Sequence, residues 1–288
     1  MIEPLHAVTY FTAEAVDAAR QAGLRGFWMG YFGCRAAPLG AVGPGTVEAV
    51  FANFAPSMVE RAIPDAWTYA APEVLVVARA EAAATALRRL VPDIDAVAER
   101  TTEPLGRIAD AATSIGRPLF AANRGIGPFD DPVARLWQLC TTLREHRGDG
   151  HVVALAAADI TGCQAHHLLA ASLGWPDDVF FDNRGWSTDD RASARSALVD
   201  RGLVDDDGLT EHGALVRARI EATTDDLAAT PITQALSAAA IAELLDALSP
   251  AAVAVTTSGE LPFPNPMGLP RPTMTAEAPH RGAVDEEG

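Results

Sequence analysis

The most informative stretch of the sequence runs from Ala194 to Gly213 and reads Ala-Arg-Ser-Ala-Leu-Val-Asp-Arg-Gly-Leu-Val-Asp-Asp-Asp-Gly-Leu-Thr-Glu-His-Gly. Gly202 follows a helical pattern and indicates its end, because glycine readily adopts the left-handed conformation found after helices. Apolar residues then flank an Asp-Gly pair, which is typical of a tight hairpin between two short strands. Another helix is expected from Glu211. The stretch therefore predicts the order helix, hairpin, helix.

The residues on either side extend the two helices. Ser187 is predicted to cap the first helix, which runs to Arg201, and Asp190 completes a capping-box pattern three residues after the cap. The second helix is expected to run from Glu211 to Ala229. Helix, small hairpin and helix in this order are the elements of a winged helix.

Two phrases within the stretch resemble the MarR-type regulators. In those proteins the recognition helix ends in Leu-x-x-x-Gly-Leu-Val, as at 198–204, and the wing returns through Leu-Thr-x-x-Gly, as at 209–213. Over about residues 5–235 the chain resembles the actinobacterial SalK-like family, in which a winged-helix segment follows an aromatic-rich helical region. The resemblance implies a cytoplasmic protein with regulator ancestry that pairs as a homodimer through terminal helices.

The charge of this segment opposes the DNA binding that the resemblance implies. In MarR-type regulators the recognition helix enters the major groove and an Arg at the wing tip reaches the minor groove. Here Arg191 and Arg195 are the candidate DNA contacts, and the tip is Asp205–Asp207. Residues 177–226 carry 13 acids and 6 arginines. Because DNA affinity depends on neutralising phosphates, DNA is a possible partner that the charge disfavours.

The composition excludes several chemistries. All 22 basic residues are Arg, against 38 acids, which gives a net charge of −16. The absence of lysine excludes Schiff-base and pyridoxal-phosphate catalysis and a P-loop lysine. No dinucleotide-binding motif or metal-ligand spacing is present, so we expect neither a cofactor nor a metal. The charge is also uneven: residues 151–288 carry 8 Arg and 21 acids.

The rest of the chain is predicted to be mainly α. We expect a helical, aromatic-rich domain over 1–130, the winged-helix domain with its small β-hairpin wing over 131–235, and a disordered tail over 250–288. The three cysteines are isolated, which favours a reduced, cytoplasmic protein. No apolar run reaches the roughly 18 residues of a membrane span, so no membrane partner is expected.

Aromatic residues gather in the first third of the chain at helical spacing, with Arg35 one turn after Tyr31. An aromatic cavity that contains an arginine suits an apolar acid or a planar metabolite. The same stripe of aromatic residues also fits an ordinary core. The candidate ligand contacts are Phe27, Trp28, Tyr31, Arg35, Asn53, Phe54 and Arg147.

A second candidate site surrounds a phrase rich in charged residues between Leu143 and His151. The helix that opens at Pro132 is expected to end near Arg147, and the glycines on both sides of Asp149 predict a tight turn after it. That turn would bring His146, Asp149 and His151 together as an acid–base cluster. Alternatively, the cationic residues only complement the dipole at the end of the helix.

Two main functional hypotheses follow from these patterns. The favoured one is a small-molecule-binding, transcription-regulator-like protein that takes its ligand in the aromatic pocket. The alternative is an enzyme on a winged-helix scaffold that uses the His146–His151 turn for acid–base chemistry on a small metabolite. A third hypothesis is a purely structural or protein-binding role for the acidic half.

Overall fold

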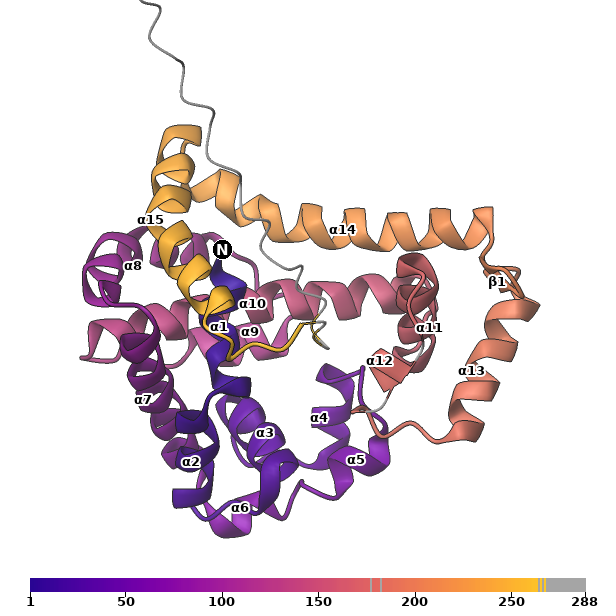
Figure 1. Ribbon diagram of the computed structural model, residues 1–288, viewed down its shortest axis with the longest axis horizontal. Helices are drawn as coiled ribbons and strands as arrows, with labels where there is room; N and C mark the ends of the chain where they lie inside the picture. Colours follow the sequence, from indigo (N-terminus) through magenta and orange to yellow (C-terminus); the bar gives the residue numbers. More distant parts are fainter. Residues whose placement is uncertain (177, 182, 264, 266, 268–288) are drawn as a thin grey trace, which may run out of the picture.

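The computed structural model describes residues 1–176, 178–181, 183–263, 265 and 267. These residues are almost wholly helical, with one two-stranded hairpin, in agreement with the mainly α fold predicted (Figure 1). Proline stands in the first turn of α4, α5, α7, α9 and α10, where its missing N–H has no helical partner to lose. The elements before residue 130 are α1 (Ile2–Phe11), α2 (Ala13–Gln21), α3 (Gly26–Ala36), the 3₁₀ turn η1 (Ala37–Leu39), α4 (Pro44–Val50), α5 (Pro56–Glu60), α6 (Ala66–Tyr69), α7 (Pro72–Leu90), α8 (Ile94–Ala111) and α9 (Pro118–Arg124).

Longer helices form the second half of the chain. They are α10 (Pro132–Ala157), α11 (Gly162–Leu173), the short α12 (Asp178–Phe181), α13 (Thr188–Asp200), α14 (Glu211–Ala235) and α15 (Ala238–Thr257), with strands β1 (Val204–Asp205) and β2 (Gly208–Leu209) between α13 and α14.

Helix α10 is the central element of the fold. Asp131 caps its first turn by accepting hydrogen bonds from the N–H groups of Val133 and Ala134, at 2.8 and 3.0 Å. The helix packs against α1, α7, α8, α9 and α14, and Leu136 and Trp137 are fully buried in the main core. In Figure 1 it crosses the molecule beneath α14.

The predicted end of this helix near Arg147 is wrong. Gly148, Asp149 and Gly150 all lie inside α10, so they form no tight turn. A Cβ on Gly150 would lie 3.5 Å from the guanidinium of Arg117 and 3.9 Å from Cβ of Leu227. A helical glycine costs about 1 kcal/mol relative to alanine, and tertiary packing on both sides of the helix offsets this cost. The glycines permit close packing rather than a change of direction.

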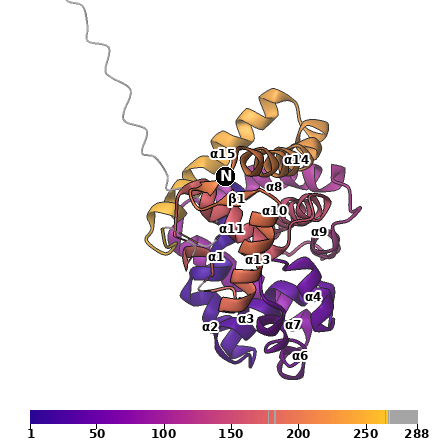
Figure 2. The same ribbon diagram turned by 90° about the vertical axis from the view of Figure 1, so that its right-hand side faces the viewer.

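The quoted stretch forms the helix, hairpin and helix that its sequence predicts. Ser187 Oγ accepts from the N–H of Asp190, and the Asp190 carboxylate accepts from the N–H of Ser187, which confirms the capping box. The strands are antiparallel, with Val204 opposite Leu209. Figure 2 views the molecule from this side, with α13 near the viewer. The buried apolar residues that join these elements to α10 and α11 are Ala154, Leu155, Ile160, Leu168, Leu198, Leu203, Val204 and Ile220.

Helix α14 is longer than the sequence predicts, and α15 lies where no helix was predicted. Helix α14 continues through Pro231 to Ala235, and α15 continues through Pro250 to Thr257. Residues 250–257 are therefore helical and not part of a disordered tail. Residues 268–288 of the predicted tail lie outside the described residues.

Within the described part of the chain, α15 is the one helix that is long and apolar enough to cross a membrane by length and composition. It nevertheless carries Glu243 and Asp246. It packs against α1 and α8. This packing accounts for its apolar side, whose buried residues are Leu244, Ala247, Leu248, Ala251, Ala252 and Val255.

Candidate functional site

A cavity of about 840 Å³ lies between the N-terminal helices and the second half of the chain. One wall comes from α1, α3 and the segment between α4 and α5, and the opposite wall comes from α10, α11 and α14. The fold thus brings distant parts of the sequence around one space. All seven residues predicted as ligand contacts line it: Phe27, Trp28, Tyr31, Arg35, Asn53, Phe54 and Arg147.

The aromatic residues of this region belong both to the core and to the cavity wall. Phe32 is buried in the core, and its ring stacks on that of Phe51 with centroids 6.0 Å apart. Phe51 and Phe54 are also buried, and both line the cavity. Trp28 and Tyr31 are only partly buried and line the cavity as well, with ring centroids 5.9 and 5.4 Å from that of Phe54. The two interpretations of the aromatic stripe, core and pocket wall, therefore overlap.

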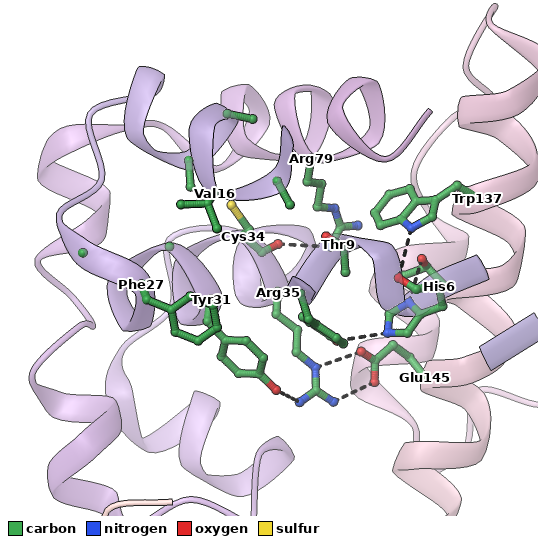
Figure 3. A pocket seen from close by; sticks show the side chains of 17 residues that line it. His6, Thr9, Val16, Phe27, Tyr31, Cys34, Arg35, Arg79, Trp137 and Glu145 are labelled. Atoms are coloured by element: carbon green, nitrogen blue, oxygen red, sulfur yellow. Dashed lines mark hydrogen bonds and ion pairs between the residues drawn. The ribbon is translucent and has the colours of Figure 1, made fainter. Parts of the chain in front are cut away.

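The guanidinium of Arg35 is fixed at the cavity wall by Glu145 of α10 (Figure 3). Its Nε and Nη2 donate to the two carboxylate oxygens at 2.9 and 3.0 Å, and its Nη1 donates to the hydroxyl of Tyr31 at 3.0 Å. Arg144 donates to the same carboxylate at 3.2 Å. Burial opposes the ionisation of Glu145, but these two cations hold its pKa well below its usual range. The ion pair ties α3 to α10.

Cationic side chains outnumber acidic ones among the described residues that line the cavity. Among the arginines that line the cavity, Arg184 is buried, and its guanidinium lies 4.6 Å from the centroid of the Phe54 ring. Burial lowers the pKa of Arg184, and nearby Arg35 and Arg144 lower it further. The arginines are Arg35, Arg144, Arg147, Arg184 and Arg217, and the acids are Glu3 and Glu221. The lining is therefore more cationic than the chain as a whole, whose net charge is −16.

The three predicted catalytic residues do not meet. His146 packs its ring against Phe120 of α9, with centroids 4.8 Å apart, and burial lowers its pKa to about 4. Its Nε2 atom has no hydrogen-bond partner. Asp149 accepts the N–H of Phe120 at 2.9 Å and so caps the first turn of α9, while burial raises its pKa to about 6.

His151 alone of the three lines the cavity. Its Nδ1 lies 3.1 Å from Oγ1 of Thr224 on α14. Because α10 is continuous, His151 lies five residues after His146 and so points to a different side of the helix. His151 therefore lies at the cavity, whereas His146 and Asp149 contact α9.

Several cavity residues were missed by the sequence analysis. Helix α1, which contributes Tyr10, was not predicted, although Pro4 in its first turn is a common helix-start signal. His166 of α11 places Nε2 2.9 Å from the carbonyl oxygen of Asn53, and the indole N–H of Trp186 donates to the same oxygen at 3.0 Å. These hydrogen bonds connect α11 and Trp186 to the segment between α4 and α5. They depend on the fold and leave no local pattern.

The two candidate DNA contacts on α13 have partners within the protein. The guanidinium of Arg191 lies 4.6 Å from the centroid of the Phe181 ring. Nη2 of Arg195 donates to the carbonyl of Asp205 at 2.9 Å and lies 3.8 Å from the Asp206 carboxylate. Arg195 thus fastens α13 to the hairpin, whose tip is acidic.

Comparison with known proteins assigns the family. A helix-turn-helix family model matches residues 1–262. The chain belongs to this helix-turn-helix family. No curated protein and no solved structure matched the chain. The match includes the aromatic N-terminal helices as well as the helix–hairpin–helix segment, so both walls of the cavity fall within the helix-turn-helix family region.

Membership of the helix-turn-helix family is consistent with a DNA-binding, regulator-like protein. Within the described residues, no group of three or more His, Cys, Asp or Glu side chains is arranged to hold a metal ion.

Proposed function

We propose that this helix-turn-helix protein is a small-molecule-binding, transcription-regulator-like protein whose ligand is a planar organic acid. The observation that carries the proposal is the composition of the two cavity walls. One wall is aromatic, and the other belongs to α10 and α11, which pack against the helix–hairpin–helix segment, and to α14, which is the second helix of that segment. A ligand between them contacts both halves of the molecule at once.

Ligand binding would then change the position of the segment that gives the family its name. A ligand shifts a conformational equilibrium only through differential contacts with the two states. Contacts with Leu169 on α11 and Ile220 on α14 would supply that difference, because these helices hold the hairpin between them. We also propose that the segment is a MarR-type winged helix of the SalK-like family. The same proposal includes pairing of the protein as a homodimer.

The ligand chemistry follows from the lining. Flat aromatic side chains favour a planar ring, and the excess of arginine favours a carboxylate. The volume of about 840 Å³ lies within the range of roughly 300–1,000 Å³ that is usual for small-molecule sites. A two-ring aromatic acid is therefore a suitable probe.

We expect 2-naphthoate to bind the wild-type protein, as measured by isothermal titration calorimetry. Leu169→Trp, which fills the cavity from α11, should weaken binding at least about tenfold, a loss of ~1.4 kcal/mol. Leu215→Trp is the matched control, because Leu215 is 64% exposed on α14. No binding to wild type, or equal affinity in the Leu169→Trp variant, would contradict the proposed ligand site.

We expect only weak DNA binding at physiological salt, no tighter than the roughly 10⁻⁴–10⁻⁶ M of non-specific complexes. The physical reason is the acidic hairpin tip, where Asp206 is fully exposed. Asp206→Arg should increase affinity for a duplex in fluorescence anisotropy more than Glu103→Arg, which changes the net charge equally at an exposed position of α8. Nanomolar binding of wild type to the promoter of its own gene would show that the charge argument is wrong.

An enzyme is the second candidate, and His151 is the observation that favours it. Its imidazole lines the cavity, and burial lowers its pKa, so it is neutral and able to accept a proton near pH 7. In that case His151 acts without His146 or Asp149. Chemical conversion of a bound acid, lost in His151→Gln while binding persists, would select this function.

A further inference from the structure

A second, smaller pocket of about 50 Å³ opens between α1, α2 and α3 (Figure 3). Its outer residues are apolar and include Val16 and Phe27, each 46% exposed. Its inner end is polar and buried. The polar groups there are His6, Arg35, Arg79, Thr141 and Glu145. The pocket is therefore apolar where it meets solvent and charged at its base.

Arg79 is the unusual member of this set. It is only 5% exposed, and the acceptors of its hydrogen bonds are neutral: Nη1 donates to the Cys34 carbonyl at 3.0 Å, and Nη2 donates to Asn123 Oδ1 at 2.8 Å and to Gln138 Oε1 at 3.3 Å. Its Nε has no hydrogen-bond partner. Figure 3 shows its guanidinium beside the indole of Trp137. Buried charges in proteins are normally paired, so this cation lacks a partner of opposite charge.

The neighbouring groups do not supply that partner. Glu145 is the one acidic residue that lines the pocket, and both its oxygens are already bound by Arg35, with Arg144 on one of them. His6 is neutral near pH 7, because burial and the charge of Arg144 lower its pKa. The base of the pocket therefore carries one positive charge in excess, on Arg79.

We propose that this pocket is an anion site for a short-chain monocarboxylate, with the carboxylate at Arg79 and the alkyl chain directed towards Val16 and Phe27. A water molecule needs about 10–15 Å³ of such space, so 50 Å³ holds roughly three to five non-hydrogen atoms. A carboxylate and its first carbons have that size. The carboxylate end of this site is separate from the larger cavity, because Arg79 does not line that cavity, although Phe27 and Arg35 line both.

The first test compares butyrate with butyramide, its neutral analogue of the same shape. Butyrate should bind the wild-type protein in calorimetry, and butyramide should bind at least about tenfold more weakly. Arg79→Met should remove the difference between the two compounds. Arg61→Met, a change of an exposed arginine elsewhere, should preserve it. Equal binding of acid and amide to wild type would overturn the proposal.

A second test needs no variant and so does not depend on how Arg79→Met folds. A crystal of the full chain grown in sodium bromide should show an anomalous bromide peak in the small pocket beside the Arg79 guanidinium. Butyrate added to the same crystals should displace the bromide. Only water in the pocket beside Arg79 under both conditions would overturn the proposal, whatever the result for 2-naphthoate in the larger cavity.

Discussion

Glu145→Gln is expected to lower the free energy of unfolding by about 3–5 kcal/mol, because it leaves a buried cation without its counter-charge. The side chain of Glu145 is 2% exposed and that of Arg35 is 12% exposed, so the pair is largely shielded from bulk water. The pair also joins α3 to α10, and its loss would loosen the wall shared by both pockets. Urea denaturation followed by circular dichroism measures the change.

The matched control is the same substitution in an exposed ion pair. Glu103 and Arg107 lie 3.8 Å apart on α8 with side chains 74% and 55% exposed, so Glu103→Gln should cost at most about 1 kcal/mol. Adding Arg35→Met to Glu145→Gln should recover part of the lost stability, because the unpaired cation is then removed. Equal effects of the two single substitutions would show that the buried pair is not stabilising.

The lowered pKa of Glu145 makes the stability of the protein dependent on pH. The pKa of Glu145 is lowered from 4.5 in the folded protein, so the unfolded chain takes up this proton at a higher pH. Its contribution to stability is therefore complete above about pH 4.5 and is lost as the pH falls towards the folded-state pKa. The stability difference between wild type and Glu145→Gln should shrink below pH 4.5. A difference that stays constant down to pH 3 would contradict the ionised pair.

Gly213→Ala is expected to destabilise the helix–hairpin–helix segment by about 3 kcal/mol or more, because the added methyl group would overlap the backbone. A Cβ at this position would lie 1.9 Å from the carbonyl oxygen of Leu203. That oxygen accepts the N–H of Thr210 at 3.2 Å and cannot turn away without losing the bond. Hydrogen exchange across 203–213 and denaturant unfolding measure the local and global effects.

Gly106→Ala is the control for this prediction. No heavy atom lies within 4 Å of a Cβ at Gly106, which sits inside helix α8. Alanine favours a helix over glycine by about 1 kcal/mol, so this substitution should stabilise the protein slightly. The same chemical change is thus expected to have opposite signs at the two positions. A Gly213→Ala protein within 1 kcal/mol of wild type would refute the steric argument.

The part of the fold that could be predicted depends on local interactions. The capping box of Ser187 and Asp190 spans three residues, and the hairpin depends on an adjacent Asp-Gly pair. The continuity of α10 could not be predicted in this way. Arg117 and Leu227 pack around Gly150 from distant parts of the chain, so their contribution becomes visible only after folding.

The residues of the candidate site could also be predicted only in part from the sequence. The aromatic residues could be identified from their spacing, because the helical period places neighbours four residues apart on one face. Arg79 was missed, although it follows Leu75 by four residues and precedes Ala83 by four on the buried side of α7. A charged residue on an apolar stripe was the available signal. That its partners are neutral follows only from where Cys34, Asn123 and Gln138 lie in space.

The uninterrupted helix α10 also fixes distances along one wall of the larger cavity. Glu145, which holds Arg35, and His151 are six residues apart on one rigid axis, a rise of about 9 Å. A flexible turn between them would have allowed the two polar groups to approach ligands of different size. Since the helix fixes the spacing of Glu145 and His151, and Glu145 holds Arg35, the position of Arg35 relative to His151 is also fixed.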